Sequence, residues 1–119
     1  MAISLEQIRK QAPDAPEGYV TRKTRHQLPG GDFIYLFVRD GLTGTLVSDQ
    51  GETLEWMRVK AGAQRLTQRL RLTVEGICRM NDVEADRGSL LVRLPPGGDL
   101  KEALDRLGRV CARVAKLTF

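Results

Sequence analysis

The chain has 119 residues, of which 41% are hydrophobic and 29% are charged, as is typical of a globular domain. This length predicts a single domain over residues 1–119. A chain of this size buries enough apolar surface to fold without stabilisation by a disulfide or a metal ion. The sequence has no run of about 18 apolar residues, which a membrane span requires, and its charged N-terminus is not typical of a signal peptide. We therefore expect a soluble, cytoplasmic protein with no membrane partner.

The charge is basic and unevenly distributed. The formal net charge is +4, and 14 of the 19 cations are arginine, whose guanidinium makes bidentate contacts with phosphate or carboxylate. Segments 19–28, 57–79 and 106–119 are basic, whereas segments 29–56 and 80–105 are acidic. This pattern favours a polyanionic or acidic partner.

Cysteine and histidine are sparse. Cys78 and Cys111 are far apart in the sequence, and His26 is the only histidine. No CxxC pair or Cys/His cluster is present, so we expect reduced thiols and no metal site. The phosphate-binding motifs GxxxxGK[ST] and GxGxxG are also absent, so we expect no nucleotide cofactor.

The first half of the chain predicts one helix and three strands. A short N-terminal helix starts at a capping box of Ser4 and Gln7, and residues 1–18 end in a proline-containing connector. Strands follow over residues 19–28, 33–38 and 45–48, separated by glycine-containing turns. We expect an antiparallel meander whose middle strand, FIYLFV, is covered by helices on at least one face.

The second half predicts three helices and a hairpin. Asp49 with Glu52 is a capping box for a helix over residues 52–61, which Gly62 ends. A helix over 64–80 and a hairpin of strands 83–85 and 89–94 follow. Asp99 with Glu102 caps the last helix, 100–117, the clearest amphipathic element. The predicted class is α+β, with about five antiparallel strands packed against helices in the order α-β-β-β-α-α-β-β-α.

One segment resembles a known family. Residues 38–56, VRDGLTGTLVSDQGETLEW, join a strand pair to a helix, and their matching positions are Leu46, Ser48, Asp49, Gly51, Glu52 and Thr53. The sequence resembles the bacterial and phage-associated domain of unknown function eighteen-twenty-eight over residues 19–118. The resemblance brings no established reaction. It implies a phage, prophage or mobile-element context, in which small proteins bind partners in host defence, counter-defence or regulation.

A catalytic interpretation is possible but not favoured. A metal-dependent nuclease needs carboxylates from two elements and a lysine, for which Asp32, Asp49, Glu52, Glu55 and Lys60 are available. Asp49 and Glu52 already form a complete capping box, and the cysteines and His26 lack the partners of a nucleophilic site. We therefore expect no enzyme.

Basic stripes are the best functional signal. The last helix, the preceding helix and the first strand each carry several cations, and together these are Arg106, Arg109, Arg113, Lys116, Arg65, Arg69, Arg79, Arg22, Lys23 and Arg25. They are either the solvated faces of amphipathic elements or a site that follows a phosphate backbone. No aromatic residue is interleaved with the arginines in the sequence, which argues against base stacking.

Trp56 and the overall function complete the predictions. Trp56 lies off the apolar face of its helix, so it is either a binding anchor or, as we favour, part of the core. We expect a small non-enzymatic binding protein that docks arginine-rich faces on nucleic acid, a nucleoprotein complex or an acidic protein surface, as an anti-CRISPR-like inhibitor would. The alternatives are a divergent metal-dependent nuclease or accessory subunit, and a homodimeric structural module.

Overall fold

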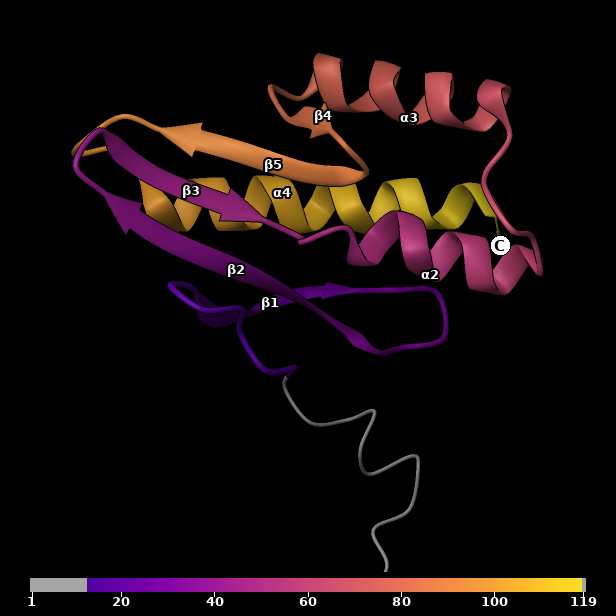
Figure 1. Ribbon diagram of the computed structural model, residues 1–119, viewed down its shortest axis with the longest axis horizontal. Helices are drawn as coiled ribbons and strands as arrows, with labels where there is room; N and C mark the ends of the chain where they lie inside the picture. The colour runs from indigo at the N-terminus through magenta and orange to yellow at the C-terminus, as the bar shows by residue number, and fades with distance from the viewer. Residues whose placement is uncertain (1–12, 119) are drawn as a thin grey trace, which may run out of the picture.

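The computed structural model describes residues 13–118 of the chain. Three strands form an antiparallel meander: β1 (Val20–Gln27), β2 (Phe33–Gly41) and β3 (Gly44–Ser48). The hairpin of β4 (Glu84–Asp86) and β5 (Ser89–Leu94) joins this meander through β5 and β3. The result is a five-stranded antiparallel sheet in the order β1-β2-β3-β5-β4, with β1 at one edge (Figure 1).

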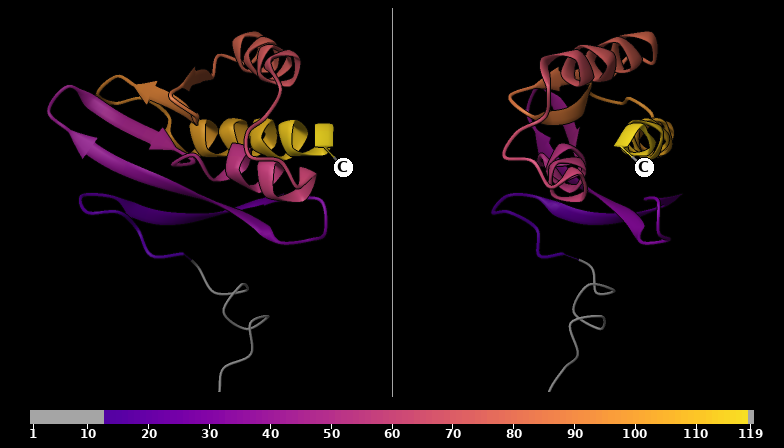
Figure 2. Two further views of the ribbon diagram at one scale, coloured as in Figure 1. Left: turned by 45° about the vertical axis from the view of Figure 1, so that its right-hand side comes forward. Right: turned by 90° about the vertical axis from the view of Figure 1, so that its right-hand side faces the viewer.

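The helices lie on one side of this sheet. Helix α4 (Leu100–Ala115) packs across the sheet against β1, β2, β3 and β5, and it continues into a short 3-10 turn, η1 (Lys116–Thr118). Helices α2 (Glu52–Ala61) and α3 (Gln68–Met80) both contact α4 (Figures 1 and 2). Among residues 13–118, no helix covers the opposite face, which we call the helix-free face.

The core lies between the sheet and α4. Ile34, Leu36 and Val38 alternate along β2 and share this side with aliphatic residues of β3 and β5, because successive strand residues point to opposite faces. From α4 the core receives Ala103, Leu107, Val110, Cys111 and Val114. The amphipathic pattern predicted for the last helix is therefore confirmed.

The predicted α+β class and the element order from β1 onward are confirmed. The predicted N-terminal helix, with its Ser4 and Gln7 cap, falls outside the described residues. The predicted start of the helix over residues 64–80 is wrong. Helix α3 starts at Gln68 because the hydroxyl of Thr67 accepts a hydrogen bond from the Leu70 amide, at 3.2 Å, and so caps the helix there.

The expected capping boxes have different outcomes. Asp99 caps α4 by accepting from the Glu102 amide at 3.1 Å, as predicted. Helix α2 has the predicted bounds, but the predicted N-cap at Asp49 is wrong, because Gly51, in the left-handed region at φ 78°, holds that position. None of the helices in the described residues is long and apolar enough to cross a membrane.

Candidate nucleic-acid interface

Three cations follow one another along the exposed face of α4 and its continuation, η1. Arg109, Arg113 and Lys116 are exposed, and their spacing of four and three residues places them on one side of the helix. Residues 109 to 116 span about 10 Å at 1.5 Å per residue. Val110, Cys111 and Val114, on the other side of the same turns, are buried in the core. The packing of α4 against the core therefore keeps the basic stripe facing the solvent.

Asp105 joins this stripe to the edge strand. Its carboxylate lies 2.8 Å from Nε of Arg25, 2.9 Å from Nε2 of His26 and 3.5 Å from a terminal nitrogen of Arg109. Hydrogen bonds from Arg25 and His26 lower the pKa of Asp105 below its ordinary value, because they favour the charged form. The carboxylate is thus ionised at neutral pH and holds two arginines from different elements side by side.

A glycine lets β1 approach α4 at this point. A Cβ on Gly108 would lie 2.9 Å from the His26 ring and 3.1 Å from the Thr24 methyl group. Thr24 is buried and donates from its hydroxyl to the Ile34 carbonyl at 2.8 Å. We call Arg25, Arg109, Arg113 and Lys116 the β1–α4 patch. It presents four cations with one adjacent carboxylate.

The prediction that Arg106 belongs to the basic stripe is wrong. Only 18% of its side chain is exposed, and it lies 3.3 Å from Glu102 and 4.0 Å from Asp82. One terminal nitrogen also donates to the Asp82 carbonyl at 3.2 Å. Arg106 therefore joins α4 to the turn after α3 and lies outside the candidate interface.

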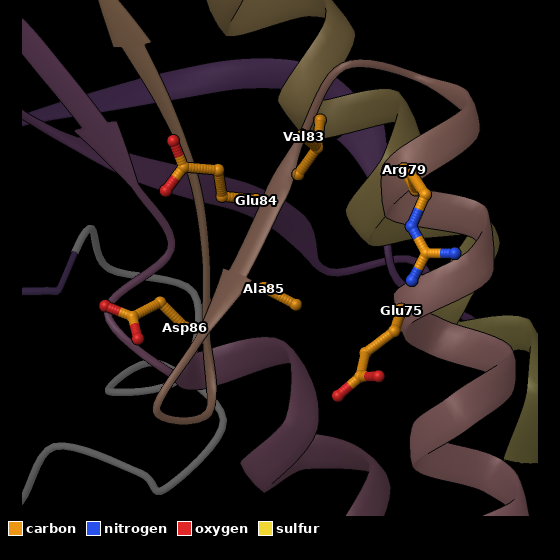
Figure 3. A pocket seen from close by; sticks show the side chains of 6 residues that line it. All are labelled: Glu75, Arg79, Val83, Glu84, Ala85 and Asp86. Atoms are coloured by element: carbon orange, nitrogen blue, oxygen red, sulfur yellow. The ribbon is translucent and has the colours of Figure 1, made fainter.

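The arginines predicted on the helix over residues 64–80 are not part of the β1–α4 patch. Arg65 lies in the segment before α3, and Arg69 is exposed on α3 itself. Arg79 lines a hollow between α3 and β4 together with Glu75 (Figure 3). Glu84 and Asp86 border the same hollow, although in Figure 3 their side chains point to the other side of β4. Of these three acidic side chains, only that of Glu75 lies on the Arg79 side of β4.

The three predicted cations of the first strand are divided between the two faces of the sheet. Arg22 is paired with Leu36, a core residue, so it lies on the α4 side of the sheet. Lys23 is paired with Tyr35 and lies on the helix-free face. Arg25 reaches Asp105 of α4. The patch therefore includes Arg25 but not Lys23.

Trp56 is half-buried and packs against the core. The Nζ of Lys60, one turn later in α2, lies 5.7 Å from the centre of the Trp56 ring. Because the ring contacts the core, the favoured prediction of a packing role agrees with the structure better than a role as an exposed anchor.

The Ser48–Thr53 motif has a structural role in this fold. Asp49 is only 1% exposed, and its carboxylate accepts hydrogen bonds from the amides of Gly51, Thr53 and Leu90, at 2.9, 3.1 and 2.8 Å. Burial raises the pKa of Asp49 above its ordinary value. This carboxylate connects the turn between β3 and α2 to β5, so its oxygens are occupied and shielded from a substrate.

The carboxylates considered for a nuclease are not brought together. Within residues 13–118, no group of three or more His, Cys, Asp or Glu side chains is arranged to hold a metal ion. Glu55 instead forms an ion pair with Arg58 on the same helix. Burial raises the pKa of Cys78 to about 11, and it raises that of Cys111 as well, so neither thiol is prepared to act as a nucleophile.

The sequence analysis missed a group of residues on the helix-free face. Tyr35 and Phe37 alternate with the core residues of β2, and Arg39 follows them on the same side. Across the strands, Lys23 is paired with Tyr35, and Leu46 lies between Arg39 and Arg93. Only the period-two alternation within the FIYLFV run could have indicated this set.

Comparisons of the chain with protein-family models, with curated proteins and with solved structures found no match. The resemblance of residues 19–118 to the domain of unknown function eighteen-twenty-eight therefore stays a prediction.

Proposed function

We propose that the protein is a non-enzymatic module that binds nucleic acid through the β1–α4 patch. The observation that carries this proposal is the geometry around Asp105, which places Arg25 of β1 beside Arg109 of α4. Arg113 and Lys116 continue the same exposed surface. Four cations gathered on β1, α4 and the turn η1 that continues α4 are suited to neutralise successive phosphates.

The dimensions of the patch support a phosphate backbone as its ligand. The stripe from Arg109 to Lys116 spans about 10 Å, which is about three nucleotides at 3.4 Å per step of one strand. Arginine is suited to this contact because its planar guanidinium binds phosphate oxygens bidentately. Such contacts position a nucleic acid without reading its sequence, so we expect binding with little sequence preference.

The experiment measures binding of labelled single-stranded and duplex oligonucleotides by fluorescence anisotropy at 50 and 200 mM salt. With four phosphate contacts on duplex DNA, affinity falls by about 100-fold between these concentrations. The double variant Arg109→Glu/Arg113→Glu loses most of the affinity, and its remaining binding depends less steeply on salt. Asp105→Asn removes the carboxylate that competes with phosphate, so it binds several-fold more tightly than the native protein.

The matched control is Arg69→Glu/Arg79→Glu, which makes the same change in net charge outside the β1–α4 patch and leaves affinity within about twofold. The proposal is wrong if the native protein does not bind at 50 mM salt, or if both double variants lose affinity equally. In the latter case the effect is one of net charge only. An anti-defence role in a phage or mobile element stays a prediction from the family resemblance.

A further inference from the structure

The aromatic residues of this chain gather on the helix-free face. Three of the six, Phe33, Tyr35 and Phe37, lie on β2 on this side, and a fourth, Tyr19, precedes β1 and lies beside Arg39 of the same face. The buried cluster between the sheet and α4 contains only aliphatic and sulfur-containing residues among its fully buried members. A sheet face that carries no helix normally has polar residues, and this face is unusual in carrying a row of aromatic side chains.

The four rings are not equally accessible. Phe37 is only 1% exposed and lies in a row with Thr21 and Ser48 on the neighbouring strands. Tyr35 is half-buried, and Phe33 is 38% exposed at the beginning of β2. The accessible part of the row is therefore formed by Phe33 and Tyr35, supported by Phe37.

Cations accompany the rings in space, although they do not in the sequence. The Nζ of Lys23 lies 4.1 Å from the centre of the Phe33 ring, and the guanidinium of Arg39 lies 5.1 Å from the centre of the Tyr19 ring. Arg93, two strands away, is held by Glu84 at 3.2 Å. Among residues 13–118, the cations of this face that form no ion pair therefore lie on β1 and β2, whereas Arg93 is paired with an acidic residue of β4.

We propose that the helix-free face binds single-stranded nucleic acid, with bases stacked on Phe33 and Tyr35 and phosphates held by Lys23 and Arg39. Sequence-tolerant single-strand sites combine these two features, because every base has a π face and every nucleotide a phosphate. The inference rests on the proposed function, because both sites bind the same class of ligand, nucleic acid. Strand β1 connects the two sites, since it carries both Lys23 and Arg25 of the β1–α4 patch. It adds that the ligand is single-stranded and that its bases are contacted.

A second copy of the chain is a poorer occupant for this face. Two copies meeting through it would bring Lys23 and Arg39 of one close to those of the other, and like charges in contact oppose association. A nucleic acid supplies opposite charge and planar groups together. The charge pattern therefore favours the nucleic acid.

The test compares two ligands that differ only in their bases. One is a 12-residue oligothymidine, and the other is an abasic 12-mer with the same phosphates. We expect the native protein to bind oligothymidine at least tenfold more tightly than the abasic strand. The double variant Phe33→Leu/Tyr35→Leu keeps the apolar bulk and removes the rings, so it binds both ligands with the weaker, abasic affinity.

The control is Leu42→Ala, which changes a fully exposed apolar residue in the turn after β2 and leaves both affinities unchanged. Circular dichroism and thermal melting establish that each variant is folded, and Tyr35→Leu alone is used if the double variant is not. The inference is wrong if the native protein binds the two ligands equally. If that equal binding is still lost in Arg109→Glu/Arg113→Glu, the proposed function stands without base contacts.

Two further outcomes would overturn the inference in different ways. If neither ligand binds at 50 mM salt, the proposed function fails together with it. If sedimentation shows a dimer that Phe33→Leu/Tyr35→Leu converts to a monomer, the aromatic face is an interface between copies.

Discussion

Asp49 shows how a residue with catalytic chemistry can serve the fold alone. Its carboxylate accepts three amide hydrogen bonds from two separate segments and is almost fully buried. Desolvation raises its pKa, while those amides act in the opposite direction. The role of the Asp49 carboxylate is therefore to accept these three hydrogen bonds, which hold the β3–α2 turn against β5.

Replacing Asp49 by asparagine should destabilise the protein by about 2 kcal/mol. One oxygen can still accept from Gly51 and Leu90, but the new NH₂ group then faces the Thr53 amide, and two buried donors oppose each other. Urea unfolding followed by circular dichroism measures the change. Asp99→Asn is the matched control, because asparagine is as good as aspartate at an exposed N-cap. Equal effects of the two substitutions would contradict the role given to Asp49.

At the scale of elements, α3 and α4 each contain one interior glycine, and the two have different surroundings. A Cβ on Gly76 of α3 would have no neighbour within 4 Å, whereas one on Gly108 of α4 would press on Thr24 and His26 of β1. Gly76 therefore only weakens its helix. Gly108 sets the distance between α4 and the edge strand.

The two glycine-to-alanine substitutions should consequently act in opposite directions. Gly76→Ala should stabilise the protein by about 0.5–1 kcal/mol, because alanine is the better helix former. Gly108→Ala should destabilise it by about 1–3 kcal/mol, because β1 must shift to make room. Thermal melting of both variants measures the difference. A stabilising Gly108→Ala would show that β1 moves away from α4 at little cost.

The helices and strands were easier to predict from the sequence than the side-chain contacts between them. The last helix was found because its apolar residues recur with the helical period, and that pattern is local. The pairing of Arg106 with Asp82 was not predictable, because it joins α4 to the turn after α3. On the helix-free face, basic residues lie beside aromatic residues of a neighbouring strand, as in the pair of Lys23 and Tyr35. That register depends on an irregularity between Lys23 and Gln27, which no residue pattern specifies.

At the scale of the whole molecule, both cysteines lie in the single core that the sheet shares with its helices. Cys78 and Cys111 are about 1% and 0% exposed, and burial raises the pKa of both thiols. Because the thiolate is the reactive form, labelling requires that the core open. The two cysteines therefore report on the cooperative unfolding of the molecule.

Both thiols should resist an aromatic disulfide reagent at pH 8 in the native protein and react within the mixing time in 6 M urea. Thr43→Cys, at an exposed turn position, is the control and should label rapidly without denaturant. Absorbance of the released thiolate measures the rates. Rapid labelling of one native cysteine would show that α3 or α4 opens without global unfolding.

The edge strand β1 has a consequence for solubility. Within residues 13–118 no strand pairs with its outer side, and eight residues of unpaired backbone invite another chain to add there. Lysine, arginine and an irregular register are features that discourage such addition, and β1 carries all three. The cations of β1 that would attract a polyanion thus also disfavour aggregation. We expect a variant that neutralises them to form intermolecular sheets more readily.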